Sequence, residues 1–206
     1  MPVTAQDVDL SVRLAIEALT GAPDKWDVPA GTLEWTCWET VEHVADDLFF
    51  YATQIGCCAS PREVPFGYGP RREGGPALTI TARREAGPDG LLQVLEACGA
   101  LLTAVVRTAA PQARAYHIFG EGDPEGFAAM GSLEVLVHTH DIAAGLGVPW
   151  QPPADLCARV LARLFPDVTP ADDPWLTLLW ATGRHDLPDR AHRTEWRWHS
   201  APLSQA

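Results

Sequence analysis

One stretch of the sequence decides the fold: MGSLEVLVHTHDIA, residues 130–143. In an α-helix, at about 100° per residue, Glu134 and His138 lie one turn apart and Asp141 falls between them around the axis. Apolar residues flank this polar seam on both sides: Val135, Ile142 and Leu146 on one, and Leu133, Val137 and Ala144 on the other. A metal ion bound by the carboxylate and the imidazole would remove the high cost of burying an unpaired charge there. His140 lies well off the seam and is not a first-choice ligand.

The same spacing also has a simpler interpretation. A carboxylate and a histidine four residues apart are common on surface helices, where they form a weak pair. A metal site at Glu134 and His138 is therefore expected only if a second helix brings another inward-facing ligand to the seam.

A second helix with such a residue is predicted at about 37–56. The tetrapeptide TCWE at 36–39 has the S/T-x-x-E form of a capping box, which opens a helix. Within this helix His43 is a lone imidazole on a largely inward face, and Asp47 follows one turn later. Two interpretations stay open. His43 is either a core histidine satisfied by Asp47, or a metal ligand whose tautomer Asp47 fixes.

The remaining pattern is mainly helical, and the expected fold is a four-helix bundle with extra short C-terminal helices. Helical spacing of apolar residues predicts further helices at about 5–20, 90–109, 125–146, 152–164 and 174–182. Residues 77–82 and 194–199 alternate, and we expect them to pair as a small two-stranded β element. The length suits a single domain, 1–206, with a core at about 5–149 and a C-terminal extension at about 150–206.

Composition excludes several classes of partner. The net charge of −12 argues against nucleic acid and against an anionic membrane surface. No apolar run approaches the roughly 20 residues of a membrane span, and the N-terminus has no secretory signal. Five cysteines without a C-x-x-C motif suit a reducing compartment, and the scarcity of lysine beside abundant arginine indicates a GC-rich bacterial source. We expect a cytoplasmic protein, either a monomer or a homodimer.

The order of these features resembles the DinB-like superfamily. An early tryptophan precedes a helix with His43, then come E-x-x-x-H-x-x-D at 134–141 and LLWATGR at 178–184. Within the superfamily the chain is most similar to the N-terminal-domain family of mycothiol-dependent maleylpyruvate isomerase, over about residues 5–185. The resemblance implies a DinB-like bundle that holds a divalent metal, usually zinc, through His43, Glu134 and His138. The longer C-terminal domain of the isomerase is expected to be absent.

The resemblance also implies a thiol-dependent transferase or isomerase that uses mycothiol, bacillithiol or glutathione. Three protein ligands leave a coordination position open, as in catalytic zinc sites. A low-molecular-weight thiol would be deprotonated there and attack an electrophilic substrate. Asp47 and Asp141 are candidates for orienting the ligand imidazoles. Several arginines are candidates for binding a carboxylate of the thiol or substrate, against the simpler interpretation of ordinary surface arginines: Arg184 and Arg190, with Arg193 and Arg197 nearby.

Three alternatives remain. The same open zinc position would activate water in a hydrolase, with Asp47 or Asp141 as general base. A metal-binding or ligand-binding module without catalysis would need the same residues. A Cys-His enzyme is disfavoured, because Cys98 lies on a core helix and no base is placed beside Cys57 and Cys58.

Overall fold

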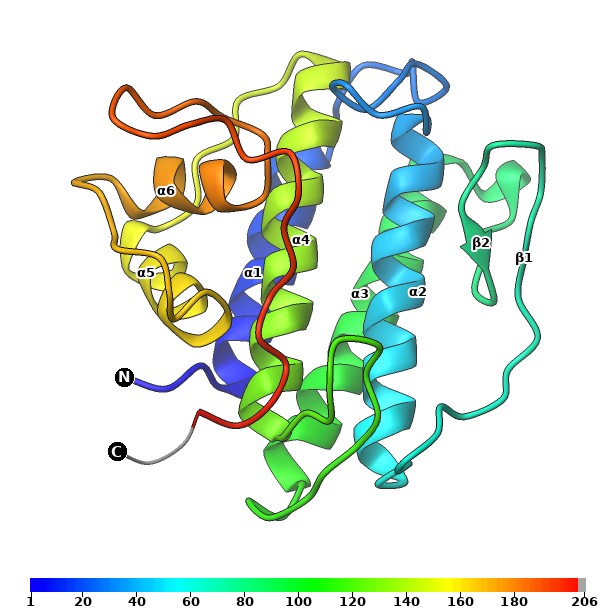
Figure 1. Cartoon of the computed structure of the whole chain (residues 1–206). Coiled ribbons are helices and arrows are strands. Elements are labelled where there is room, and N and C mark those ends of the chain that lie inside the picture. Colours follow the sequence, from blue (N-terminus) through cyan, green and yellow to red (C-terminus); the bar gives the residue numbers. More distant parts are fainter. Residues whose placement is uncertain (204–206) are drawn as a thin grey trace.

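Four long helices build the bundle of this chain, of which the computed structural model describes residues 1–203 (Figure 1). The bundle helices are α1 (Ala5–Leu19), α2 (Cys37–Gly56), α3 (Gly87–Thr108) and α4 (Pro124–Leu146). A single 3₁₀ turn, η1 (Arg84–Ala86), leads into α3. Two shorter helices follow, with α5 (Ala154–Leu164) packed on α4 and α6 (Pro174–Ala181) packed on α5. The prediction of a mainly α fold is confirmed, and the helix bounds lie close to those expected.

Side-chain caps fix where α2 and α4 begin, and hence which way their residues face. At α2 the predicted capping box is present: the Glu39 amide donates to Thr36 Oγ1 at 3.1 Å, and the Thr36 amide donates to Glu39 Oε2 at 2.9 Å. At α4 the carboxylate of Asp123 accepts from the Gly126 amide at 2.7 Å. The helix ends at Gly147, whose φ of 73° favours glycine.

Helix α4 is the central element of the molecule. It packs against α1, α2, α3 and α5, and side chains on different faces, such as Phe127, Leu133 and Leu136, are fully buried. A helix that is covered on nearly all sides keeps its polar residues away from bulk water. The polar seam of α4 therefore lies inside the bundle.

The small sheet differs from the expected one. Strand β1 (Gly69–Pro70) pairs antiparallel with β2 (Ala77–Leu78), so the predicted pairing of 77–82 with 194–199 is wrong. Beyond β2, carboxylates of α2 replace a partner strand. Asp46 Oδ1 accepts from the amides of Thr79 and Ile80, at 2.8 and 2.5 Å, and Glu42 Oε1 accepts from the Ala82 amide at 2.8 Å.

Residues 194–200 form an extended segment, here called the C-terminal strap, which runs along α4 (Figure 1). Its backbone bonds to α5 rather than to a strand: the His199 amide donates to the Leu164 carbonyl at 2.7 Å. Arg163 of α5 donates to the carbonyls of His199 and Ser200 at 3.0 and 3.2 Å. The alternating pattern of the strap arises because Trp198 is buried while the neighbouring His199 side chain is exposed.

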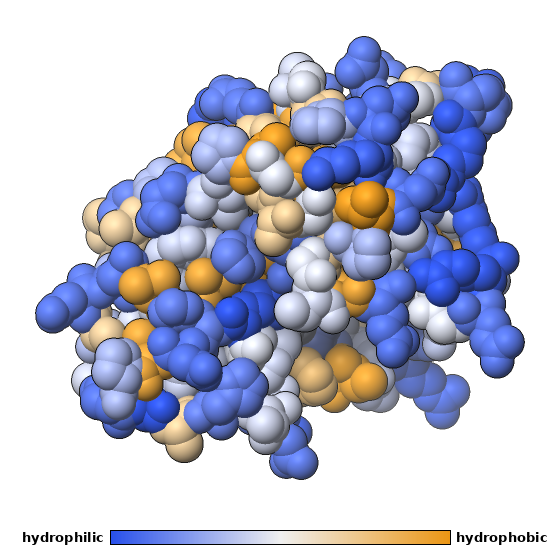
Figure 2. All heavy atoms as spheres, turned by 90° about the horizontal axis from the view of Figure 1, so that it is seen from above, coloured by the Kyte–Doolittle hydropathy of each residue, from blue (hydrophilic) through white to orange (hydrophobic). Residues whose placement is uncertain are grey.

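One helical stretch, Arg84–Thr108, is long and apolar enough to cross a membrane by length and composition alone, which the sequence analysis did not anticipate. A core helix of a soluble protein passes the same test. Leu91, Leu95 and Leu102 of this stretch are buried, and α3 packs on α1 and α2. The face of the molecule in Figure 2 is mostly hydrophilic, with scattered hydrophobic groups. These contacts make α3 a helix of the bundle that buries one face against α1 and α2.

Candidate metal centre

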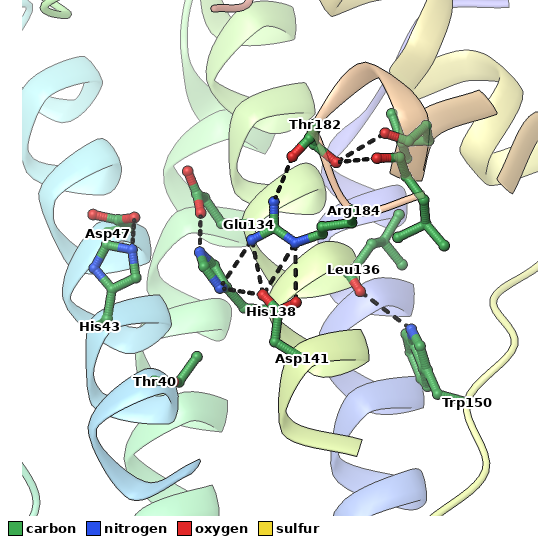
Figure 3. Close-up of polar contacts among 12 residues, drawn as sticks. Thr40, His43, Asp47, Glu134, Leu136, His138, Asp141, Trp150, Thr182 and Arg184 are labelled. Atoms are coloured by element: carbon green, nitrogen blue, oxygen red, sulfur yellow. Dashed lines mark hydrogen bonds and ion pairs between the residues drawn. The ribbon is translucent and has the colours of Figure 1, made fainter. Parts of the chain in front are cut away.

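Helices α2 and α4 bring three candidate metal ligands together inside the bundle. One nitrogen or oxygen atom from each of His43, Glu134 and His138 lies within 4.8 Å of the other two. Figure 3 shows His43 on α2 facing the two α4 residues. Within residues 1–203, these three side chains form the one group of His, Cys, Asp or Glu residues that is placed to hold a metal ion. Two segments about ninety residues apart in the chain therefore meet at one point.

The imidazole of His138 is held on both of its nitrogens. Nε2 lies 3.2 Å from Glu134 Oε2, and Nδ1 lies 3.1 Å from Asp141 Oδ2. Burial alone would lower the pKa of His138, but its contacts with Asp141 and Glu134 raise that pKa above the ordinary value. With Nδ1–H donated to Asp141, Nε2 is left toward Glu134 as a ligand atom.

Arg184 pairs with the same carboxylate, that of Asp141. Its Nε lies 3.1 Å from both carboxylate oxygens, and its Nη2 lies 2.8 Å from Oδ2. A further donor, Nη1, reaches the Thr182 carbonyl at 3.2 Å (Figure 3). Burial alone would raise the pKa of Asp141, but the hydrogen bonds from His138 and Arg184 lower it, so the carboxylate stays ionised. A chain of contacts thus runs from Arg184 through Asp141 to His138.

His43 has a similar carboxylate neighbour on its own helix. Asp47 Oδ2 lies 3.4 Å from His43 Nε2, and the His43 ring packs between Trp35 and His138, with ring centroids 4.7 and 5.0 Å away. Burial, helped by His138, lowers the pKa of His43 to about 4, which keeps the imidazole neutral as a ligand must be. Burial and the Glu134 charge raise the pKa of Asp47 well above its usual range.

The donor set fits a divalent metal. Two imidazoles and one carboxylate are ligands that zinc accepts. Burial alone would raise the pKa of Glu134, but contact with His138 and the nearby positive groups lower it, so this group carries a negative charge. A buried carboxylate beside two imidazole nitrogens favours a bound cation, which would take the place of a proton on His138.

A cavity of about 370 Å³ opens onto these three residues and Arg184. The rest of its wall is apolar: Leu33, Trp35, Phe119, Leu133, Val137, Trp196 and Trp198. These wall residues were not predicted from the sequence. A usable signal was present in the alternation WRW at 196–198, because it places Trp196 and Trp198 on one side of an extended segment.

The predicted arginines lie in different surroundings. Arg184 lines the cavity, with its guanidinium engaged by Asp141. The Arg190 guanidinium lies 5.0 Å from the centre of the Trp180 ring and 3.9 Å from Asp189, and Arg190 is not among the residues that line the cavity. Arg193 and Arg197 lie over aromatic rings, the latter 5.7 Å from Phe119.

Comparisons with known proteins identify the family and the fold of this chain. A family model described as the mycothiol maleylpyruvate isomerase N-terminal domain matches residues 9–143. Two crystal structures share the fold: mycothiol-dependent maleylpyruvate isomerase (17% identity, TM-score 0.58) and a histidine-to-alanine mutant of it (19%, 0.59). Each alignment covers 87% of this chain and 88% of that one, which contradicts the expectation that a long C-terminal part is missing. No curated protein matched. The chain belongs to the family of the mycothiol maleylpyruvate isomerase N-terminal domain.

Proposed function

We propose that this protein is a metal-dependent S-transferase or isomerase that uses a low-molecular-weight thiol as cosubstrate. One observation carries the proposal: the ligand atoms of His43, Glu134 and His138 meet at the wall of a largely apolar cavity. Membership of a family of mycothiol-dependent enzymes supports the thiol and the catalytic role. Mycothiol is the thiol that we favour, and an electrophilic small molecule is the second substrate.

Zinc is the metal that best suits the two imidazoles and the carboxylate. A divalent cation held by His43, Glu134 and His138 would supply the positive charge that favours the thiolate form of a bound thiol. The protein's own part is to position the ligands: Asp141 orients His138, Arg184 orients Asp141, and Asp47 lies against His43.

The arginines and the cavity wall complete the proposal. Arg184 is the better candidate for an uncharged polar group of the thiol, because it lines the cavity, whereas Arg190 would act only from outside it. The aromatic wall excludes water from the reacting groups. We further propose a single cytoplasmic domain, monomeric or homodimeric, without nucleic-acid or membrane partners.

The geometry favours this function over two of the alternatives. In a hydrolase, Asp141 is a poor general base because Arg184 and His138 already engage both of its oxygens, which leaves Asp47 as the candidate. In a Cys-His enzyme, the nucleophile would have to be a reactive thiol. Cys98 is buried, and burial raises the pKa of its thiol to about 11.

Metal content tests the site. Protein purified without a His-tag is analysed by inductively coupled plasma mass spectrometry. His138→Ala should lose stoichiometric metal, whereas His140→Ala should retain it. His140 is a matched control because it lies two residues away but packs on Trp175, with ring centroids 5.8 Å apart. Equal metal content in the two variants would contradict the proposed ligand set.

Activity tests the reaction class. Conjugation of mycothiol to a generic electrophile, abolished by a chelator, supports the transferase. Ester or amide cleavage without thiol would support the hydrolase instead. Inertness in both assays, with metal bound, would leave a non-catalytic binding module.

A further inference from the structure

The wall of the cavity at the metal centre is dominated by aromatic rings. Trp35 comes from the loop before α2, Phe119 from the loop before α4, and Trp196 and Trp198 from the C-terminal strap. Phe119 and Trp198 meet edge to face with ring centroids 5.2 Å apart, and Trp196 lies 5.9 Å from Trp198. Four rings from three segments therefore surround whatever enters, and aromatic faces favour apolar and π-rich groups.

No cationic side chain of this wall is free to receive an anion. Among the described residues that line the cavity, the basic side chains are Arg184 and two histidines, and His138 is already engaged by Glu134 and Asp141. Asp141 also takes three contacts of Arg184 at 2.8–3.1 Å. The Thr182 carbonyl takes another. A carboxylate on the substrate would have to compete with Asp141, which is itself buried and would lose its partner.

The remaining charges of the site give no net attraction for an anion either. Glu134 is the carboxylate of the ligand set, and Arg184 and Asp141 form an ion pair that is neutral overall. A divalent cation and one thiolate would together add a single positive charge, which Glu134 offsets. An anionic substrate would therefore bring an uncompensated charge among aromatic rings, where burial of a charge is costly.

We propose that the electrophile of this protein is uncharged and apolar, such as an aryl-substituted or alkyl-substituted molecule, rather than a mono- or dicarboxylic acid. This inference rests on the thiol-dependent function proposed above. It assigns the choice of substrate to the loops and the strap that carry the four rings, and not to the metal ligands.

A matched pair of electrophiles tests the inference in the holoenzyme. Benzyl chloride and 4-(chloromethyl)benzoate differ by one carboxylate. In both, the thiolate sulfur forms a bond to the benzylic carbon, the carbon–chlorine bond breaks, and chloride leaves with the electron pair. We expect kcat/KM with mycothiol to be at least about tenfold higher for the uncharged compound, after correction for its uncatalysed rate. Equal values, or a preference for the benzoate, would overturn the inference.

A second measurement needs neither metal nor thiol. Benzyl alcohol and 4-(hydroxymethyl)benzoate cannot react, and their binding is followed by ligand-observed NMR titration. The alcohol should bind at least about tenfold more tightly. If neither chloride is consumed but this preference is present, the proposed function fails while the inference stands. If both chlorides are consumed equally well, the function stands and the inference fails.

An added positive charge provides the matched control. Leu33 is a half-buried loop residue that lines the cavity, so Leu33→Arg places a new cation there. This variant should bind 4-(hydroxymethyl)benzoate about tenfold more tightly than the wild type. Leu101→Arg adds the same charge on α3, at a side chain that is 40% exposed outside the cavity, and should not. An unchanged preference in Leu33→Arg would show that wall charge does not select the substrate.

Discussion

The orientation of the His138 ring is fixed by Asp141. Asp141 accepts from Nδ1, and Arg184 in turn fixes Asp141 with two of its nitrogens. Replacing Asp141 with asparagine keeps the shape of the side chain but removes its charge, so that Arg184 is left without a counter-ion 3.5 Å from a ligand imidazole. We expect Asp141→Asn to lower metal affinity about 10- to 100-fold, the usual effect of losing such a partner.

The measurement is a competition titration with a chromophoric chelator. Asp186→Asn is the matched control, because this exposed carboxylate pairs with His192 and not with a ligand. An unchanged affinity in Asp141→Asn, or an equal loss in both variants, would remove Asp141 from the site.

The pKa of a second buried histidine, His117, predicts how the free energy of unfolding depends on pH. Its Nδ1 accepts from the Phe119 amide at 3.1 Å and faces the Ser200 hydroxyl at 3.0 Å, which favours a neutral ring. Burial lowers the pKa of His117 from 6.5 to about 4. Between these values the unfolded chain binds more protons than the folded one, so stability is complete above pH 6.5 and falls as the pH drops toward 4.

From this shift, His117 alone should make the free energy of unfolding about 2 kcal/mol smaller at pH 5 than at pH 7. His117→Gln, which cannot titrate, should remove that part of the pH dependence, while His43 continues to supply its own. Urea denaturation at the two pH values measures the difference. The same flattening in His192→Gln, an exposed histidine, would mean that burial of His117 is not the cause.

At the scale of elements, periodicity and caps were sufficient to predict the helices. The apolar spacing of α1 to α6 and the TCWE box at 36–39 needed no knowledge of distant contacts. The extended segments were harder to predict. Alternation of apolar and polar residues indicates which side chains are buried, but it does not indicate which element the segment packs against or bonds to. Residues 194–199 alternate against α5, and residues 79–82 bond to carboxylates of Glu42 and Asp46. The metal-ligand candidates could be proposed from α2 and α4, but the cavity wall depends on loop paths that the sequence does not encode locally.

Close contact between elements gives a prediction for the end of α4. A Cβ atom at Gly145 would lie 2.5 Å from the Pro29 carbonyl oxygen and 2.6 Å from Cys37 Sγ. The Pro29 oxygen belongs to the backbone and cannot rotate away, so Gly145→Ala should force α4 away from the loop before α2. We expect a loss of about 1–3 kcal/mol in the free energy of unfolding, measured by urea denaturation.

Gly56→Ala at the end of α2 is the control for that experiment. Its new Cβ would meet Val105 at 3.4 Å, an ordinary contact, and alanine has the higher helix propensity. This variant should be as stable as the wild type or up to about 1 kcal/mol more stable. Similar losses at both glycines would refute the steric explanation.

At the scale of the whole molecule, the two parts of the site come from different parts of the chain. His43, Glu134 and His138 lie within residues 9–143, which the family model covers. Arg184, Trp196 and Trp198 follow that region and form the second wall of the cavity. In the proposed function the bundle would thus supply the ligands, while the C-terminal part would determine what can approach them. Any change that loosens the C-terminal strap should therefore alter substrate binding before it alters metal binding.

Substitution of Arg163 tests whether loosening the C-terminal strap affects substrate binding more than metal binding. Arg163 is 2% exposed and joins Asp123 at the start of α4 to the carbonyls of His199 and Ser200 in the C-terminal strap. Arg163→Met leaves these groups without their donor, and we expect a loss of about 3 kcal/mol in stability together with release of the strap. Metal content should stay stoichiometric, while binding of benzyl alcohol weakens.

Limited chymotrypsin digestion followed by mass spectrometry reports the strap directly, because release exposes the peptide bonds after Trp196 and Trp198. Arg159→Met is the matched control: Arg159 lies on the same helix and pairs with Asp7 and Asp155, not with the strap. It should lose stability without faster cleavage at the two tryptophans. If both variants are cleaved there at the same rate, general loosening explains the result. The strap would then be held by the packing of its tryptophans rather than by Arg163.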